Sequence, residues 1–469
     1  MRAANNPPMR NARVALVNMG CAKNLVDSEW MLGSVRQAGY QTTSNLAGAE
    51  VVIVNTCAFI AEATEESKQV LRELARARRR GVHRVLICAG CLSQRFREQV
   101  LHEFPEVDAL VGVDCYREMG AIVRRALAGE QVVRLRAPTV VPHTVLPRMV
   151  STPPWTAYLK ISEGCDHACS FCAIPSIRGR YRSTPIPVLV REAQALAARG
   201  AKELNLVSQD STQYGHDLPA RGRGAHRPKP ARAGKPDLTD LLVALEEVEG
   251  IRWLRVLYAY PTRVRRRLLE WMGRSERLCH YLDLPIQHVS ARLLKAMCRS
   301  GSADSYRRMI ETARSLVPDV TLRTTVIAGF PGETDADFEE LCRFLEEVKF
   351  DRLGAFAFRA EEGTAAAGKR NQVPDEVKEE RRRRIMELQA RVSLERGRAQ
   401  VRKVLPVLVE SVDARRGVAV GRSPRDAPEV DGVTVVRCGS RPLPNAGQFV
   451  HARITRADEH DLHGVLVRR

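Results

Sequence analysis

Cys165-Asp166-His167-Ala168-Cys169-Ser170-Phe171-Cys172 directly follows a short apolar run, residues 158–162, and carries three thiols at the spacing C-x3-C-x2-C. Three thiolates this close can hold three corners of a 4Fe–4S cubane, which takes four ligands, so that the fourth iron is open to a small molecule. Zinc is the main alternative, but structural zinc sites usually consist of two matched pairs and are closed. Three clustered cysteines without a matched second pair therefore favour an open iron–sulfur cluster.

Three further cysteines follow predicted strands in the first part of the chain. Short apolar, β-branched runs at 13–19, 51–55 and 84–88 alternate with amphipathic stretches at 25–38 and 60–79, and they lead to Cys21, Cys57 and Cys91. This pattern predicts an open parallel α/β domain over residues 11–133. Because the carboxyl ends of parallel strands share one crevice, these distant thiols could hold a second cluster, again with one iron free.

The other cysteines carry a weaker signal. Cys88 and Cys91 form a C-x2-C pair, which would suit a redox pair or half of a zinc site, but Cys88 lies inside an apolar run and is more simply a buried small residue. The scattered single cysteines are expected in the core: Cys115, Cys279, Cys298, Cys342 and Cys438.

The middle of the chain predicts a partial barrel. Residues 134–154 hold five prolines and no helical periodicity, which predicts an extended linker. Strand–helix alternation then returns six times, and it predicts an open (β/α)6 barrel within a domain at 155–400 that includes a long, charged, solvated helix at 377–399. The expected strands are 157–162, 203–207, 252–258, 281–285, 321–328 and 353–358.

Polar clusters follow several of these barrel strands, at the end where chemistry gathers in such barrels. They are residues 208–211 after the second strand, Gln287-His288 after the fourth and residues 329–333 after the fifth. For His288 a structural or substrate-loop role is favoured over that of a catalytic base. A glycine-proline turn before a helix explains residues 329–332 as well as a ligand contact does.

The C-terminal part predicts a small all-β barrel. Residues 403–469 contain five short strands, at 404–412, 417–420, 433–436, 449–455 and 464–467, between Gly, Pro and Asp turns. Residues 219–236 form an insertion with six Arg or Lys and no acidic residue, predicted to be disordered in isolation. For this insertion a neutral loop is favoured over a contact with ribosomal RNA.

Composition limits the setting in which the chain works. The net charge of +19 suits a polyanionic partner, although an arginine-rich proteome explains it nearly as well. No apolar run approaches the roughly 18 residues of a membrane helix, and the first residues lack the apolar centre of a signal peptide. We therefore expect a cytoplasmic protein without membrane contact, whose 12 cysteines are metal ligands and reduced core residues.

These motifs together resemble those of the radical S-adenosylmethionine methylthiotransferases. The radical S-adenosylmethionine loop is represented by C-D-H-x-C-x-F-C and by residues 179–183, Gly-Arg-Tyr-Arg-Ser. The family's N-terminal signatures are represented by Gly20-Cys21, Asn55-Thr56-Cys57 and Gly90-Cys91, and residues 421–432 are similar to a TRAM domain. The resemblance extends from about residue 14 to residue 467.

The resemblance implies two 4Fe–4S clusters, one on Cys21, Cys57 and Cys91 and one on Cys165, Cys169 and Cys172, with S-adenosyl-L-methionine as the cosubstrate. One S-adenosylmethionine would methylate a sulfur species on the first cluster, and a second would be cleaved at the other cluster to give a 5′-deoxyadenosyl radical. Phe171 would shield that cluster, and Ser208, Gln209 and Gly329 are the expected contacts of S-adenosylmethionine.

Members of this family modify either an adenosine of transfer RNA or an aspartate of the small-subunit ribosomal protein at the decoding centre. Three segments resemble the second group: residues 21–27, 208–211 and 457–462. The resemblance therefore implies methylthiolation of the aspartate β-carbon, with that protein, a ribosomal subunit or its assembly intermediate, an electron donor and a sulfur donor as partners. The alternatives are a transfer RNA adenosine methylthiotransferase and a ribosome-binding iron–sulfur protein without catalysis.

Overall fold

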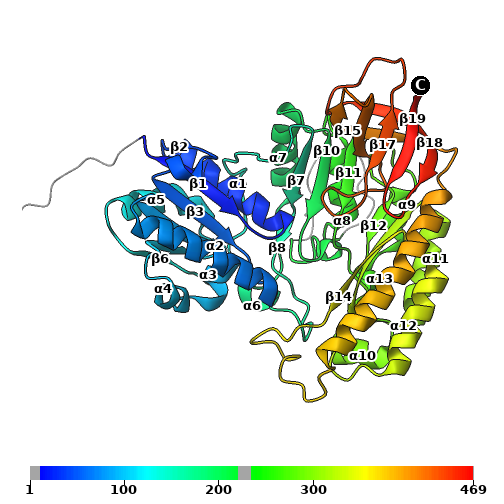
Figure 1. Cartoon of the computed structure of the whole chain (residues 1–469), viewed down its shortest axis with the longest axis horizontal. Coiled ribbons are helices and arrows are strands. Elements are labelled where there is room, and N and C mark those ends of the chain that lie inside the picture. The colour runs from blue at the N-terminus through cyan, green and yellow to red at the C-terminus, as the bar shows by residue number, and fades with distance from the viewer. Residues whose placement is uncertain (1–10, 220–233, 468–469) are drawn as a thin grey trace, which may run out of the picture.

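The computed structural model of the chain describes residues 11–219 and 234–467, so that most of the basic insertion at 219–236 lies outside the described residues. The described residues form a parallel α/β domain, a partial (β/α) barrel and a small closed β-barrel, in chain order (Figure 1). This arrangement confirms the predicted fold class. No described helix is both long and apolar enough to cross a membrane.

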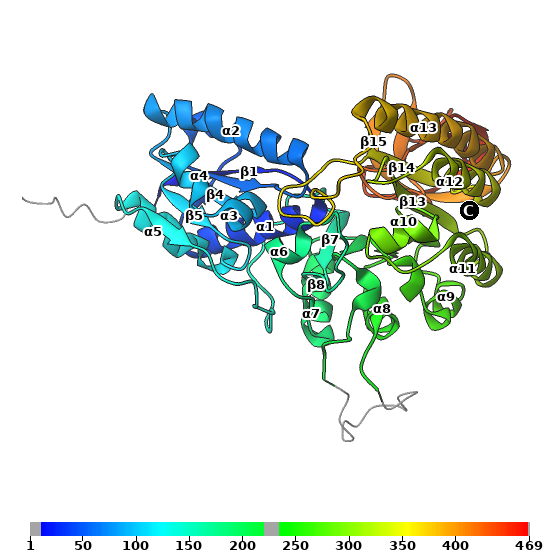
Figure 2. The ribbon, with the colours of Figure 1, turned by 90° about the horizontal axis from the view of Figure 1, so that it is seen from below.

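The N-terminal domain is built on a six-stranded parallel sheet in the order β2-β1-β3-β4-β5-β6. All residues of the central strands β3 and β4 are buried, because helices cover both faces. In Figure 2, α2 (Ala61–Arg79) lies on one face, and α1 (Ala22–Gln37) with α5 (Met119–Leu127) lies on the other. The strands are β1 (Arg13–Asn18), β2 (Gln41–Thr42), β3 (Val51–Thr56), β4 (Val85–Gly90), β5 (Ala109–Val111) and β6 (Val132–Arg134).

The order of strand addition reverses at β1, since β2 lies on one side of β1 and the next strand, β3, lies on its other side and starts the run toward β6. A ligand crevice forms at such a switch point, outside the carboxyl ends of the strands. Two short helices, α3 (Cys91–Phe96) and α4 (Gln99–Glu103), follow β4 at this edge.

Residues 135–155 contain no helix or strand but are anchored to both neighbouring domains. The buried guanidinium of Arg148 pairs with Glu29 of α1 at 2.6 Å and with Glu192 at 2.8 Å, where Glu192 belongs to a barrel helix. This segment therefore acts as a bracket between the domains.

Six parallel strands form the predicted partial barrel. Strands β7, β10 and β11 make one ladder and β12, β13 and β14 make the next, and a parallel bridge from Leu254 to Leu278 connects the two. The bounds are β7 (Thr156–Lys160), β10 (Glu203–Val207), β11 (Trp253–Val256), β12 (Tyr281–Asp283), β13 (Thr321–Ala328) and β14 (Arg352–Ala357).

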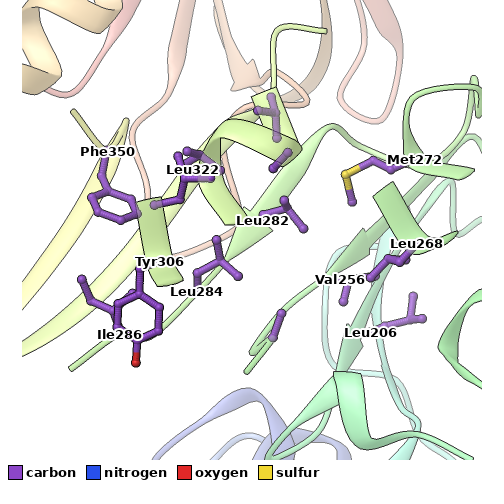
Figure 3. Close-up of a cluster of buried hydrophobic side chains, with 14 of the residues drawn as sticks. Leu206, Val256, Leu268, Met272, Leu282, Leu284, Ile286, Tyr306, Leu322 and Phe350 are labelled. Atoms are coloured by element: carbon purple, nitrogen blue, oxygen red, sulfur yellow. The ribbon is translucent and has the colours of Figure 1, made fainter. Parts of the chain in front are cut away.

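Helices cover the outside of the barrel, and the apolar core of this domain lies between these helices and the strands. Figure 3 shows part of this core, where strand residues such as Leu206, Leu282 and Leu322 lie near the helix residues Leu268 and Tyr306. The helices are α7 (Ile186–Ala198), α8 (Leu238–Glu246), α9 (Arg266–Met272), α10 (Ala291–Ala296), α11 (Ala303–Leu316), α12 (Asp335–Val348) and α13 (Asp375–Arg398).

Helix α13 differs from the solvated helix that its charge predicts. Its residues Ile385, Leu388 and Val392 are buried in the barrel core, at the helical spacing of an amphipathic face. The charged side chains occupy the other face, where for example Arg383 pairs with Glu380 and Glu387.

The C-terminal strands close into a barrel in the order β15-β16-β17-β19-β18. Alternate residues fill its interior, among them Val407, Val409, Ala419, Val436 and Ile454. The strands are β15 (Val404–Asp413), β16 (Val418–Arg422), β17 (Thr434–Arg437), β18 (Phe449–Ala457) and β19 (Leu462–Val467).

The single cysteines are buried as predicted, with one exception. Cys88, Cys115, Cys279, Cys342 and Cys438 are buried, whereas Cys298 is exposed. The prediction for Cys298 was wrong because this residue lies in the turn after α10, with a left-handed φ of 55° that directs the chain out of the helix.

Candidate functional site

Cys21, Cys57 and Cys91 follow β1, β3 and β4 at the crevice of the N-terminal sheet. Cys21 occupies the cap position of α1, and Cys91 is the first residue of α3. The loops of Cys21 and Cys57 approach closely because Gly20 has a φ of +94° and no side chain, and a Cβ at that position would lie 3.0 Å from the Cβ of Cys57.

The other three predicted ligands lie in the loop 164–181, between two short antiparallel strands, β8 (Ser162–Glu163) and β9 (Arg182–Ser183). Gly164 has a φ of +78°, and a Cβ there would lie 2.1 Å from the carbonyl oxygen of Arg180, so that glycine lets the two arms of the loop meet. The backbone N–H of Cys165 donates to the carbonyl of Gly179 at 3.1 Å. These contacts close the base of the loop. The loop carries the three thiols of Cys165, Cys169 and Cys172.

Both sets of cysteines line one cavity of about 360 Å³ at the junction of the N-terminal domain and the barrel. For brevity, the N-terminal triad denotes Cys21, Cys57 and Cys91, and the loop triad denotes Cys165, Cys169 and Cys172. The structure thus brings together six cysteines from two domains.

The donor set of each triad fits an iron–sulfur cluster. Thiolates are the usual protein ligands of 4Fe–4S clusters, and each triad offers three of them to the cavity. Among the described residues, no three His, Cys, Asp or Glu side chains converge as they would around a single metal ion.

The protonation of the thiols reflects burial and local charge. Burial raises the pKa of Cys57 and Cys165 to about 11 and that of Cys172 to about 12. At Cys21 the loss of solvent around the thiol acts in the same sense, but the charges of Lys23 and Arg178 and the backbone N–H groups of Asn24 and Lys23 together outweigh it and lower the pKa. Because metal ligation requires thiolates, binding would release protons from the buried thiols.

Arg178, the last residue of α6 (Ile174–Arg178), connects the loop triad to the N-terminal domain. Its guanidinium donates to Asn24 at 2.5 Å and pairs with Asp27 at 3.0 Å and Glu163 at 2.9 Å. It also lies 3.4 Å from the sulfur of Cys91. The residue therefore contacts the N-terminal triad from the loop that carries the other triad.

Lys160 completes this buried network. It pairs with Asp27 and, at 2.7 Å, with Glu163, and its ammonium lies 4.4 Å from the ring centroid of Trp30. Although burial opposes ionisation, the charges of Arg178 and Lys160 hold the pKa of Glu163 well below its usual range. Two cations and two carboxylates thus join the domains beside the cavity.

An aromatic and cationic wall faces the loop triad. His167 stacks on Tyr260 with 4.0 Å between ring centroids, and its Nε2 lies 2.7 Å from Asp210. Arg299 lies 4.3 Å from the centroid of the same tyrosine ring and 3.7 Å from the sulfur of Cys169. The wall positions a guanidinium against one predicted cluster ligand.

The predicted S-adenosylmethionine contacts occupy different places. Phe171 and Gln209 line the cavity. Ser208 is buried, and its carbonyl oxygen accepts a hydrogen bond from Lys23 at 3.3 Å. Gly329 does not line the cavity, and a Cβ there would lie 2.2 Å from a side chain of α13. The structure therefore brings Gly329 to a helix contact rather than to the thiols.

His288 is fully buried outside the cavity lining, where burial lowers its pKa to about 4. Its Nε2 lies 3.7 Å from Glu333, and its Nδ1 accepts the N–H of Ser290 at 3.0 Å.

Sequence reasoning missed several cavity residues. Tyr258 and Tyr260 follow β11 at the strand end where polar clusters are expected, so the strand position could have indicated them. Arg178 lies 6 residues beyond Cys172, within the motif region, whereas Arg299 follows a helix at no recognisable spacing.

Comparison with known proteins places the chain in a family. Residues 13–112 match the uncharacterized protein family UPF0004, residues 159–345 match the radical SAM superfamily, and residues 401–467 match the TRAM domain. The chain is 48% identical over 452 residues to the ribosomal protein uS12 methylthiotransferase RimO of Desulforudis audaxviator (strain MP104C), covering 96% of both chains. The chain belongs to the uS12 methylthiotransferase family. It is therefore a radical S-adenosylmethionine methylthiotransferase.

Other relatives agree over the same length. The proteins of the same name from Pelotomaculum thermopropionicum (strain DSM 13744 / JCM 10971 / SI) and Geobacter sulfurreducens (strain ATCC 51573 / DSM 12127 / PCA) are 44% and 41% identical, covering 97% and 98% of this chain and 99% and 100% of theirs. Among solved structures, the radical S-adenosylmethionine methyltransferase TsrM from Kitasatospora setae, with cobalamin and a [4Fe-4S] cluster bound, is similar in fold. Its TM-score is 0.54 at 13% identity, over 76% of this chain and 74% of that one.

Proposed function

We propose that this enzyme attaches a methylthio group to the β-carbon of an aspartate in ribosomal protein uS12, using two 4Fe–4S clusters and two molecules of S-adenosylmethionine. The observation that carries the proposal is the shared cavity, since two cysteine triads from different domains face the same space. A substrate side chain in that space would face both sets of thiols. The names of the relatives at 41–48% identity support uS12 as the substrate.

The N-terminal triad would hold one cluster and the loop triad the other, with Phe171 and Gln209 beside the loop triad as contacts of S-adenosylmethionine. When bound, the clusters and S-adenosylmethionine supply the electron, the radical and the methylthio group that acid–base catalysis cannot provide. The electron donor, the sulfur donor and the ribosomal subunit or its assembly intermediate are the partners that this proposal requires.

The residues of this chain position the two triads and limit the access of water. Arg178 contacts Cys91 while belonging to the loop of the other triad, so the buried ion pairs fix one triad relative to the other. Phe59, Phe171 and Tyr258 contribute aromatic surface to the cavity, which would shield the reacting groups from water once the cofactors and the substrate are bound.

Mass spectrometry of uS12 tests the proposal. Cells with the gene should carry a methylthio-sized mass increment on one aspartate of uS12, and cells without it should not. An unmodified uS12 in both strains, with a methylthio-adenosine of transfer RNA that depends on the gene, would reassign the substrate. Absence of 5′-deoxyadenosine after anaerobic reduction of the purified protein with S-adenosylmethionine would contradict the proposed use of that cosubstrate.

A further inference from the structure

Lys23 crosses from the N-terminal domain to the barrel inside the shared cavity. It lies in the first turn of α1, two residues after Cys21, and is only 9% exposed. Its ammonium donates to the carbonyl oxygen of Ser208 at 3.3 Å and lies 3.8 Å from the ring centroid of Tyr258. The charge is therefore held between the two halves of the cavity, in a lining that includes both cysteine triads.

The charge of Lys23 lacks the carboxylate partners that its neighbours have. Lys160 and Arg178 each pair with the carboxylates of both Asp27 and Glu163. Lys23 donates to a carbonyl oxygen, faces an aromatic ring and lies in the field of the Cys21 thiol, whose pKa it helps to lower, but no carboxylate of the described residues forms an ion pair with it. A buried cation is costly without an anionic partner, so its presence in a ligand cavity indicates that a ligand brings the anion.

Two amide oxygens of the same cavity also lack partners. The Oε1 atoms of Gln209 and Gln287 are buried without a hydrogen bond within the described part of the chain. The Nε2 of Gln209 is held by Glu163 at 2.8 Å, which fixes the orientation of that amide. Gln287 has a left-handed φ of 68°, a conformation that is strained for a residue with a side chain. These oxygens offer hydrogen-bond acceptors for N–H groups of a bound peptide.

We propose that Lys23 is the specificity-determining residue that receives the side-chain carboxylate of the substrate aspartate, with Gln209 and Gln287 accepting N–H groups of the peptide around it. This inference rests on the proposed function and adds the group that recognises the acidic side chain. An asparagine at the modified position would lose the charge-assisted hydrogen bond and would bind less tightly.

Arg299 is a second cation without a carboxylate partner among the described residues, but it belongs to a different part of the cavity. Its guanidinium lies against Cys169 of the loop triad and donates to the carbonyl of Pro285 at 2.6 Å. The carboxylate of S-adenosylmethionine, the cosubstrate proposed for the loop triad, is the matching anion there. Lys23, next to Cys21, remains for the substrate.

The test is a double-mutant cycle that combines an enzyme variant with a substrate variant, and the measured quantity is the dissociation constant of the peptide. The reconstituted holoenzyme, as the native chain and as Lys23→Met, is titrated with two synthetic peptides that span the uS12 segment, one with aspartate and one with asparagine at the modified position. For the native enzyme the asparagine peptide should bind about 10- to 100-fold more weakly, the range of a hydrogen bond to a charged group. For Lys23→Met the two peptides should bind equally.

Two further variants separate charge from folding. Lys23→Arg keeps a cation and should retain a preference for aspartate. Lys202→Met removes a lysine that is likewise held by a backbone carbonyl, that of Gly447 at 2.6 Å, but lies outside the cavity, and it should leave the preference unchanged. Iron content and the thermal midpoint of each protein establish that the compared proteins are folded and loaded.

The outcomes distinguish the two proposals. A Lys23→Met enzyme that still prefers the aspartate peptide by the native factor would overturn the role of Lys23 while leaving the proposed function intact. A selective loss of S-adenosylmethionine binding in that variant, with the aspartate preference retained, would also overturn it. A native holoenzyme that binds and modifies neither the peptide nor uS12 would instead contradict the proposed function.

Discussion

Cys57 and Cys88 show how burial and position separate two similar thiols. Both are buried, and they belong to neighbouring parts of one sheet: Cys57 directly follows β3 and Cys88 lies within β4. Cys57 lines the shared cavity, whereas Cys88 lies in the core, with the Ser93 hydroxyl 3.3 Å from its sulfur. A proposed cluster ligand and an ordinary core residue of the same sheet are therefore available for direct comparison.

We expect Cys57→Ala to abolish methylthiolation and to reduce iron by about half, because one of the two proposed clusters would lose a ligand. Cys88→Ala should keep the iron content and activity of the native protein. Iron and sulfide analysis after anaerobic reconstitution, together with the mass of uS12, measures both effects. A fully active Cys57→Ala enzyme would contradict the assignment of the N-terminal triad.

At the scale of elements, the regular alternation of apolar and polar residues predicts the strands well, whereas features that depend on local turns and tertiary contacts are predicted poorly. All six barrel strands and all five C-terminal strands lie where the apolar alternation indicates, within a few residues. Cys298 and helix α13 were misjudged because a turn with φ of 55° and the burial of one face of a charged helix both depend on tertiary contacts. The β8–β9 pair has only two residues per strand, which is too short for a periodic signal.

The contact of α6 with α1 gives a prediction at this scale. Arg178→Met would leave Asp27 and Glu163 buried with less compensation, and removing one partner of a buried network costs about 3–5 kcal/mol. We expect a lower urea midpoint for the transition in which α6 separates from α1. Hydrogen exchange of the α1 amides, measured at increasing urea concentration, monitors this transition.

Arg180→Met is the matched control, because the Arg180 side chain is 93% exposed and its ion pair with Asp166 should contribute less than about 1 kcal/mol. Equal midpoints for Arg178→Met and Arg180→Met would show that the buried network does not hold the domains together.

At the scale of the whole molecule, the strand-end argument predicted that Cys21, Cys57 and Cys91 would share a crevice, and the structure brings them together. The junction of that crevice with the loop triad could not be predicted, since it depends on how two domains pack. Lys23 and Arg178 act across this junction, and their partners are 185 and 151 residues away in the chain. Local spacing carries no signal for such contacts.

A buried ion pair joins the C-terminal barrel to the partial barrel, and it should make the free energy of unfolding depend on pH. Glu203 of β10 accepts hydrogen bonds from Arg422 of β16 at 2.6 Å and from Arg255 of β11 at 3.2 Å. Although burial opposes ionisation, these charges lower the pKa of Glu203 to about 2. The carboxylate therefore joins the C-terminal barrel to the partial barrel only while it is ionised.

Because the folded pKa lies below the unfolded value of about 4.3, the contribution is fully present above that value and is lost as the pH falls toward 2. A shift of this size corresponds to about 3 kcal/mol. We expect the difference in unfolding free energy between the native protein and Glu203→Gln to be constant from pH 7 to pH 5 and to narrow between pH 4.5 and pH 3. Glu387→Gln, at a position 61% exposed, serves as the control and should show no such narrowing. A difference that stays constant down to pH 3 would mean that Glu203 does not carry its charge into the folded contact, and that the two barrels are held by their apolar surfaces instead.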